Sequence, residues 1–337
     1  MSSQAEQGLN QLREGQQVEL VCLLADKRLL QTKAGKPFGS LVLSDGEGRL
    51  EAKLWDRAPE LLEPLAVGTP VRVQGRVQSY NGQLQLVLSA LEAAPGVDPA
   101  RFLPRSPHAP ADLWARFERL VRVVKQRRLR RVLDLFFDDP EFRRQFELAP
   151  AAKGAHHAYV HGLLEHTVSV GGLALKAAEH YRHLGRDLLL TGALLHDVGK
   201  VREFTLGPPI DYTDAGRLEG HLVLGVRMLD QRLARTRNFP PELARHLRHF
   251  ILSHHGSLEF GSPRRPKTAE AMVLHLIDDL DAKTAMIQQA AQEQKDPQAH
   301  WSGYHRLLER YLYTGPMPGR DEEEPSPDRS TPGLFDS

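Results

Sequence analysis

The chain of 337 residues, 41% of them hydrophobic and 26% charged, has the length and composition of a globular protein with two domains. Its 44 basic and 43 acidic side chains leave a net charge of +1, which excludes nucleic-acid binding driven by bulk charge, so such binding must rest on local patches. A single cysteine, Cys22, excludes an intrachain disulfide and a cysteine-based zinc site. Met1–Gln7 shows no secretion signal and no apolar run is long enough to span a membrane, so we expect a cytoplasmic protein without a membrane partner.

Five segments of the N-terminal part read as short β-strands, with apolar and polar residues alternating most clearly in the last three: residues 18–24, 38–43, 50–55, 71–78 and 83–88. Asp45-Gly46 and Asn81-Gly82 supply residues that tolerate the positive φ of tight hairpin turns. A short helical connection over residues 57–65 separates the third strand from the fourth. This order of elements predicts an all-β OB-fold barrel over residues 1–94.

OB-folds bind single-stranded nucleic acid by stacking bases on aromatic rings and by pairing phosphates with cations. The barrel offers candidates of both kinds: Phe38, Trp55, Tyr80, Arg72 and Arg76. Each of these residues taken singly is more typical of core packing or of a solvated surface. The barrel as a whole nevertheless predicts nucleic-acid binding.

Five prolines between residues 95 and 111 predict a semi-rigid linker. Asp112 is a typical N-cap, and apolar residues at helical spacing predict one long helix from there to Phe136. Its polar positions carry a dense set of cations: Arg116, Arg119, Arg122, Lys125, Arg127, Arg128, Arg130 and Arg131. Such a run is usually a solvated helix face, and RNA phosphates are the alternative partner.

The second half of the chain differs chemically from the first, because all 16 histidines lie at or beyond His108. Helical periodicity covers residues 163–181, 187–196, 219–235, 241–253, 268–294 and 304–311. We therefore predict an all-α domain over residues 112–314. From residue 315 onward the chain is rich in Pro, Asp, Glu and Ser, which predicts a disordered tail over residues 315–337.

The apolar run Gly192-Ala193-Leu194-Leu195 ends in a histidine and an aspartate. His196 and Asp197, side by side at a helix end, can share a divalent cation, and the carboxylate can bridge to a second one. Lys200, one turn later, can meet an anionic substrate oxygen. A lone His-Asp pair is more often a core pair than a metal site. This pair is accompanied by further candidate ligands, which together suffice for two ions: His166, His221, His254, His255 and Asp278.

These residues resemble the HD superfamily of metal-dependent phosphohydrolases, in its longer form with the order His, His-Asp, His, His-His, Asp. A closer resemblance, to the YhaM family of 3′→5′ exoribonucleases that join an OB-fold to an HD domain, lies in His156-His157-Ala158-Tyr159, Leu163-Leu164-Glu165-His166-Thr167, Gly216-Arg217 with Gly220-His221, and Ser253-His254-His255-Gly256. One position departs from the pattern: His161 stands where glycine is usual. It predicts altered local packing, or a polar group at the mouth of the pocket.

The resemblance implies a ligand set for two divalent ions. One ion would be held by His166, His196, Asp197 and Asp278. Asp197 would bridge to a second ion, held by His221, His254 and His255. The resemblance also supports catalytic roles for Asp197 and Lys200. Imidazoles and carboxylates without thiolates suit Mn²⁺, our first expectation, and also Fe²⁺, Co²⁺, Mg²⁺ or Zn²⁺.

The roles of several neighbouring residues stay open. Three histidines before His166 have contact with substrate or support of a metal ligand as alternatives: His156, His157 and His161. On the predicted helix over residues 268–294, Asp279 and Asp281 compete with Asp278 for the ligand position, and the resemblance favours Asp278. A role in structure or in substrate contact is the alternative for Asp281 and Lys283. His275 precedes Asp278 by three residues and is expected to orient its carboxylate.

Three functions follow from these patterns. The first is a metal-dependent 3′→5′ exonuclease that shortens single-stranded RNA, with single-stranded DNA as an alternative substrate, and releases nucleoside 5′-monophosphates. The second is an HD-type phosphohydrolase of nucleotides or cyclic dinucleotides, for which a barrel that binds single strands has no evident use. The third is a non-catalytic nucleic-acid adaptor, which a complete ligand set disfavours because burying seven such groups without ions is costly. The oligomeric state is open.

Overall fold

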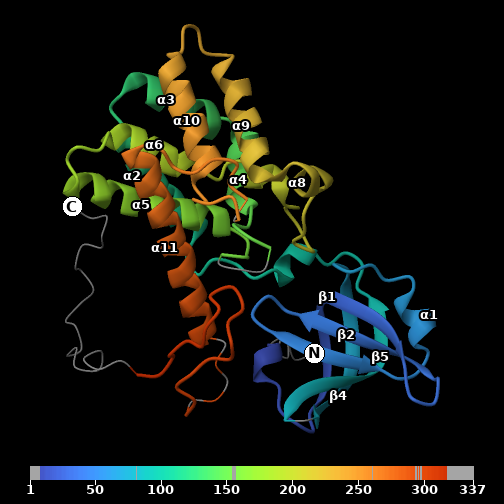
Figure 1. Ribbon diagram of the computed structural model, residues 1–337. Helices are drawn as coiled ribbons and strands as arrows, with labels where there is room; N and C mark the ends of the chain where they lie inside the picture. The colour runs from blue at the N-terminus through green and yellow to red at the C-terminus, as the bar shows by residue number, and fades with distance from the viewer. Residues whose placement is uncertain are drawn as a thin grey trace. The chain divides into compact units, whose positions relative to one another are not determined.

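The computed structural model describes residues 8–80, 82–153, 157–259, 261–292, 294, 296 and 298–316 (Figure 1). The predicted turn residue Asn81, the candidate His156 and the predicted tail from residue 317 onward lie outside the described residues. The chain divides into two compact units, residues 1–105 with 205–211, and residues 106–204 with 212–337. The division falls between residues 105 and 106, and a short segment from the middle of the helical half groups with the first unit.

The first unit is a closed five-stranded barrel with the strand order β1-β2-β3-β5-β4. Its elements are η1 (Leu9–Gln11), β1 (Gln17–Gln31), β2 (Pro37–Ser44), β3 (Arg49–Leu54), α1 (Ala58–Leu62), β4 (Pro70–Tyr80), β5 (Gln83–Ala93) and η2 (Pro99–Phe102). Neighbouring strands are antiparallel except for β3 and β5, which run parallel. The order of strands and helix confirms the predicted barrel.

The first strand, β1, is longer than its sequence pattern predicts. It continues to Gln31 because its second half pairs through backbone hydrogen bonds with β2, although its side chains there are largely exposed. A register shift between Leu24 and Asp26 interrupts the alternation at this point. A strand held mainly by its backbone leaves no apolar periodicity, and so the pattern could not reveal it.

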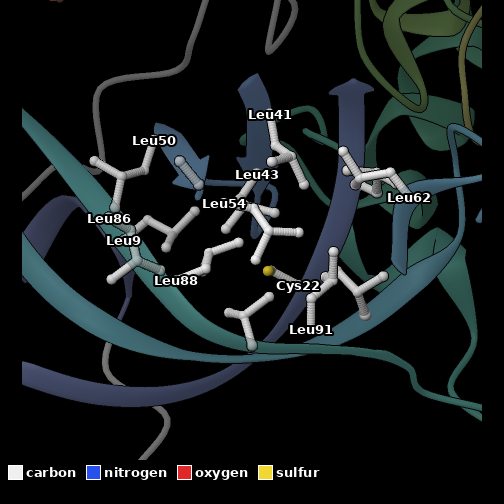
Figure 2. Close-up of a cluster of buried hydrophobic side chains, with 14 of the residues drawn as sticks. Leu9, Cys22, Leu41, Leu43, Leu50, Leu54, Leu62, Leu86, Leu88 and Leu91 are labelled. Carbon is white, nitrogen blue, oxygen red and sulfur yellow. The ribbon is translucent and has the colours of Figure 1, made fainter. Parts of the chain in front are cut away.

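The barrel interior is filled by the inward-facing residues of every strand, as Figure 2 shows for Leu41, Leu43 and Leu54 around Cys22. On β4, Val71, Val73 and Val77 are fully buried, whereas the residues between them face outward or lack a side chain. Burial, with a contribution from Asp45, raises the pKa of the Cys22 thiol to about 12. Cys22 is therefore an inert part of the core.

The second unit is helical. Its helices are α2 (Pro110–Val123), α3 (Arg127–Phe137), α4 (Pro140–Leu148), α5 (Gly162–His180), α6 (Arg186–Leu195), α7 (Lys200–Glu203), α8 (Asp214–Leu218), α9 (Gly220–Leu233), α10 (Pro241–Ser253) and α11 (Ala269–Gln292). Helix α5 packs against α2, α6 and α11, and α10 packs against α6 and α9 (Figure 1). Among the described residues, no helix is both long and apolar enough to cross a membrane.

Two predictions for this unit are wrong. The single helix predicted from Asp112 to Phe136 is broken into α2 and α3, because Asp187 accepts hydrogen bonds from the backbone N–H groups of Lys125 and Gln126, at 2.7 and 2.6 Å. Asp187 lies 61 residues from Gln126 in the chain, so no local sequence pattern could predict the break between α2 and α3. Residues 304–311 form no helix either. They lie in a hairpin held by the bridges Trp301–Tyr313 and His305–Arg310.

Candidate metal centre

The seven predicted ligands come from five separate helices or their ends. His166 lies on α5, His221 in the first turn of α9, and Asp278 on α11, while His254 and His255 directly follow α10. His196 and Asp197 lie in the turn between α6 and α7. Gly199 allows this turn to approach α9, since a Cβ on it would lie 1.9 Å from the carbonyl oxygen of His221. The fold thus brings together residues that are far apart in the chain.

Asp197 lies between two groups of imidazoles and turns one oxygen towards each. Its Oδ2 is 3.3 Å from Nε2 of His196 and 3.6 Å from Nε2 of His166. Its Oδ1 is 3.4 Å from Nε2 of His254 and 3.6 Å from Nε2 of His221. The carboxylate is almost fully buried, at 2% exposure. This is the arrangement expected of a carboxylate that bridges two ions.

The first group, on the Oδ2 side, is completed by Asp278. Its Oδ1 is 3.1 Å from Nε2 of His166 and 3.6 Å from Nε2 of His196, and these two nitrogens are 3.2 Å apart. The second group, on the Oδ1 side, contains His255, whose Nε2 lies 3.2 Å from Nε2 of His221. The structure therefore collects all seven predicted residues in one place. Their role as ligands stays a prediction.

The other ring nitrogens, Nδ1, are held by hydrogen bonds that leave Nε2 facing the centre. Nδ1 of His196 donates to the carbonyl of Ala193 at 2.8 Å, and Nδ1 of His254 donates to that of Ile251 at 3.0 Å. Two carboxylates do the same for His166 and His221: Asp281 accepts from Nδ1 of His166 at 2.7 Å, and Glu203 accepts from Nδ1 of His221 at 2.9 Å. Such partners fix the tautomer and raise the basicity of the inward nitrogen.

Two buried polar atoms test whether these residues fit divalent cations. Oδ1 of Asp197 and Nε2 of His254 face each other, and neither has a hydrogen-bond partner among the described residues. Both are acceptors, because Nδ1 of His254 carries the ring proton, and an unsatisfied buried acceptor costs about 1–3 kcal/mol. A cation between them would satisfy both. The donor set of imidazole nitrogens and carboxylate oxygens fits such a cation.

The electrostatics differ between the two groups. At His196, burial opposes the charged ring, but Asp197 and Asp278 outweigh it and raise the pKa to about 10. At Asp197, burial also opposes charge, yet Lys200 and His196 hold the pKa well below its usual range. On the other side, burial and the neighbouring rings lower the pKa of His255 to about 3. One side therefore attracts positive charge, and the other offers a neutral imidazole ready to bind a cation.

Lys200 starts α7 and is buried beside the centre. Its Nζ lies 2.6 Å from Oδ2 of Asp197. Burial lowers the pKa of the ammonium, but Asp197, Asp278 and Glu203 raise it above its usual value. The side chain is therefore a permanent cation at the site. Its predicted contact with substrate stays a prediction.

Glu203 holds one of the predicted ligands in place and was not among the residues predicted from the sequence. Its carboxylate accepts from both the backbone N–H and Nδ1 of His221, at 3.0 and 2.9 Å, and so fixes the start of α9 as well as the ring. Its partner His221 lies 18 residues further along the chain, and no local spacing in the sequence indicated the pair. Asp281 was expected to compete for the ligand position or to serve structure or substrate, and its contacts match the structural alternative. Besides His166, it accepts from the hydroxyl of Ser169 and lies 3.3 Å from Nε2 of His157.

The remaining candidates near the centre have other partners. His157 contacts the hydroxyl of Tyr159 at 2.8 Å. His161 adopts a left-handed φ of 72° before α5, the conformation that favours glycine, and its Nδ1 donates to the carbonyl of Glu147. The expectation that His275 orients Asp278 is wrong, because Nδ1 of His275 donates to the carbonyl of His254 at 2.8 Å. Asp279 pairs with Lys283 in an exposed position and faces away from the ligands.

The predicted nucleic-acid residues of the barrel fall into two groups. Phe38 on β2 stacks on Trp55 after β3, with ring centroids 4.7 Å apart, and Trp55 is 40% exposed. Tyr80, which is 66% exposed, and Arg76 lie on the outer face of β4. Strand β5 lies between β4 and β3, so these two residues are on a different strand pair from Phe38 and Trp55. Arg72 lies on the same face, between the carboxylates of two neighbouring strands, Glu19 and Glu92. The stacked pair is the stronger candidate, because the charge of Arg72 is already matched.

Comparisons with known proteins agree with this architecture. The HD domain family matches residues 163–283, and the family described as an OB-fold nucleic acid binding domain matches residues 9–94. These matches confirm the predicted fold class, an OB-fold barrel followed by a helical HD domain. Among solved structures, the second OB-fold domain of replication protein A from Methanococcus maripaludis is 17% identical, with a TM-score of 0.23, over 27% of this chain and 96% of that chain.

Relatives of similar length match both domains at once. The 3′-5′ exoribonuclease YhaM of Geobacillus sp. is 34% identical over 291 residues, which are 86% of this chain and 89% of the relative. The protein of the same name from Bacillus velezensis is 36% identical over 284 residues, 83% of this chain and 90% of the relative. An HD domain implies dependence on divalent metal, and the His and Asp clusters can bind it. The chain belongs to the YhaM family of 3′-5′ exoribonucleases.

Proposed function

We propose that this chain hydrolyses single-stranded RNA stepwise from its 3′ end, releases nucleoside 5′-monophosphates, and does so in the cytoplasm with two divalent ions, Mn²⁺ first among them. The observation that carries the proposal is the position of Asp197, which turns one oxygen to each of two imidazole groups. The name of the relatives supplies the 3′→5′ direction.

The ligands of the two ions would be those of the two groups. His166, His196 and Asp278 would hold one ion and His221, His254 and His255 the other, with Asp197 shared. Divalent ions in such a site activate water at neutral pH and neutralise phosphoryl oxygens. The Nδ1 hydrogen bonds to Asp281 and Glu203 keep the inward nitrogens of His166 and His221 in place.

Lys200 is the protein cation nearest to the shared carboxylate, 2.6 Å away. Because its ammonium is buried and stays charged, Lys200 would offset the negative charge of a substrate phosphate that approaches the centre beside Asp197. It would thus position the scissile phosphate as well as hold Asp197. In the barrel, the stacked pair of Phe38 and Trp55 would bind bases of the same strand upstream of its 3′ end.

The test is hydrolysis of 5′-labelled single-stranded RNA by the purified chain with each divalent ion in turn. A ladder of products shortened from the 3′ end, seen with Mn²⁺ and abolished by EDTA, is the expected result. A circular strand should resist, and a stable 3′ hairpin should stall the enzyme. Rapid cutting of circular RNA would show an endonuclease, and cleavage of nucleotides or cyclic dinucleotides alone would show the phosphohydrolase alternative. The same assay with single-stranded DNA decides between the two kinds of strand.

A further inference from the structure

A concave basic surface lies where α2 ends and α3 begins, and none of the residues that line it belongs to the candidate metal centre. Figure 1 labels the two helices. It encloses about 780 Å³, and six of its eight lining residues are Lys or Arg, with Asp134 the single acid. We call this surface the basic cleft, and its cations are Arg122, Lys125, Arg127, Arg128, Arg130 and Arg131. A chain whose net charge is only +1 has concentrated positive charge here.

Half of these cations make no hydrogen bond or ion pair within the part of the chain that the structure describes. Arg130 donates to the carbonyl of Val121 and pairs with Asp134 at 3.7 Å, and Lys125 and Arg128 donate to backbone carbonyls. The other three guanidinium groups make no hydrogen bond or ion pair with any residue that the structure describes, and all three side chains are exposed: Arg122, Arg127 and Arg131. Their exposed guanidinium groups can meet an external anion, and only Arg131 among the three also acts on the charge of a carboxylate that lines the cleft, Asp134.

The cleft is built by the fold and is not the face of a single helix. The break between α2 and α3 turns the chain, and Asp187 holds the break by accepting from two backbone N–H groups. It therefore brings cations from the last turn of α2 and the first turn of α3 to one place. The lining contains no aromatic residue, so the cleft suits a phosphate backbone better than a base.

We propose that the basic cleft binds backbone phosphates of the single-stranded RNA substrate, upstream of the nucleotide that is cleaved. This inference rests on the proposed function for the identity of the strand. Asp187, beside the cleft, and His196, at the metal centre, lie near opposite ends of α6, about 14 Å apart along the helix. Only a strand long enough to cover that span reaches both places, so the cleft contributes to long substrates and not to short ones.

The test compares two triple variants of the full-length chain with the unaltered chain. Arg122→Gln/Arg127→Gln/Arg131→Gln removes the three unpartnered cations of the cleft. The matched control, Arg264→Gln/Arg265→Gln/Lys267→Gln, removes three exposed cations between α10 and α11. Binding of a long phosphorothioate RNA, which keeps the backbone charge and resists hydrolysis, is measured by fluorescence anisotropy between 50 and 200 mM salt. Hydrolysis of a dinucleotide is measured in parallel.

Three phosphates released from the cleft should make the slope of log K against log salt shallower by about two, since each phosphate contact of a single strand contributes about 0.7. Affinity of the unaltered chain should then fall about 16-fold more than that of the cleft variant between the two salt concentrations. The control variant should keep the original slope, and dinucleotide hydrolysis should be unchanged in both. The inference is overturned if the cleft variant keeps the slope of the unaltered chain, or if the slope of the control variant becomes shallower by the same amount. If the unaltered chain failed to shorten 5′-labelled single-stranded RNA from its 3′ end, the proposed function itself would be contradicted.

Discussion

Replacing Asp197 by Asn tests the centre most directly, because it removes one negative charge and keeps the shape of the side chain. Without metal, Asp197 and the ammonium of Lys200 form a buried pair at 2.6 Å. Removing one partner of such a pair costs about 3–5 kcal/mol, since the other charge stays buried without compensation. For a domain of roughly 150–250 residues this lowers the Tm by roughly 6–20 °C, which thermal melting in EDTA measures.

The same substitution should abolish hydrolysis. Loss of one group that stabilises charge at a reacting centre costs roughly 100- to 1000-fold in rate, and Asp197 faces both groups of imidazoles, so we expect at least the larger loss. The rate is measured with Mn²⁺ and single-stranded RNA, and the metal content by mass spectrometry. Asp197→Asn with near-normal hydrolysis and full metal content would refute the assignment of a shared carboxylate.

A double variant separates the loss of stability from the loss of hydrolysis. Asp197→Asn/Lys200→Met removes the uncompensated ammonium as well, so the Tm should recover most of the loss while hydrolysis stays absent. If the Tm remained as low as in the single variant, the buried pair would not be the source of the instability.

Three further predictions concern the surroundings of the centre and the barrel. Asp281→Asn should weaken metal affinity roughly 10- to 100-fold by releasing the imidazole that it orients, as metal titrations of activity would show, whereas the exposed Asp279→Asn should not. Gly199→Ala should lower both the Tm and the activity because its Cβ would clash with a backbone oxygen 1.9 Å away, and equal behaviour of Gly207→Ala, which meets nothing within 4 Å, would contradict this. Trp55→Ala should weaken binding of long single strands by about 1–3 kcal/mol per stacked base, measured by anisotropy, with dinucleotide hydrolysis retained.

The sequence by itself was sufficient for the barrel and for the set of residues at the centre. Alternation on β4 and the two Gly-containing turns are local properties, and the chain keeps them whatever surrounds them. The centre could be predicted from two pairs of adjacent residues, His196-Asp197 and His254-His255, because such pairs can bind metal whatever the fold. The resemblance to a family then selected Asp278 among three neighbouring aspartates.

Only the tertiary structure decided how these residues act. The two-sided position of Asp197 depends on α5, α6, α9 and α10 meeting at one place. Asp281 supports His166 from 115 residues away, and Asp187 breaks the predicted helix from 61 residues away. A sequence pattern records the preferences of neighbours within a few turns, whereas these bonds form between segments that packing alone brings together. For that reason the residues that gather at the centre could be predicted from the sequence, whereas the hydrogen bonds that hold them in place could not.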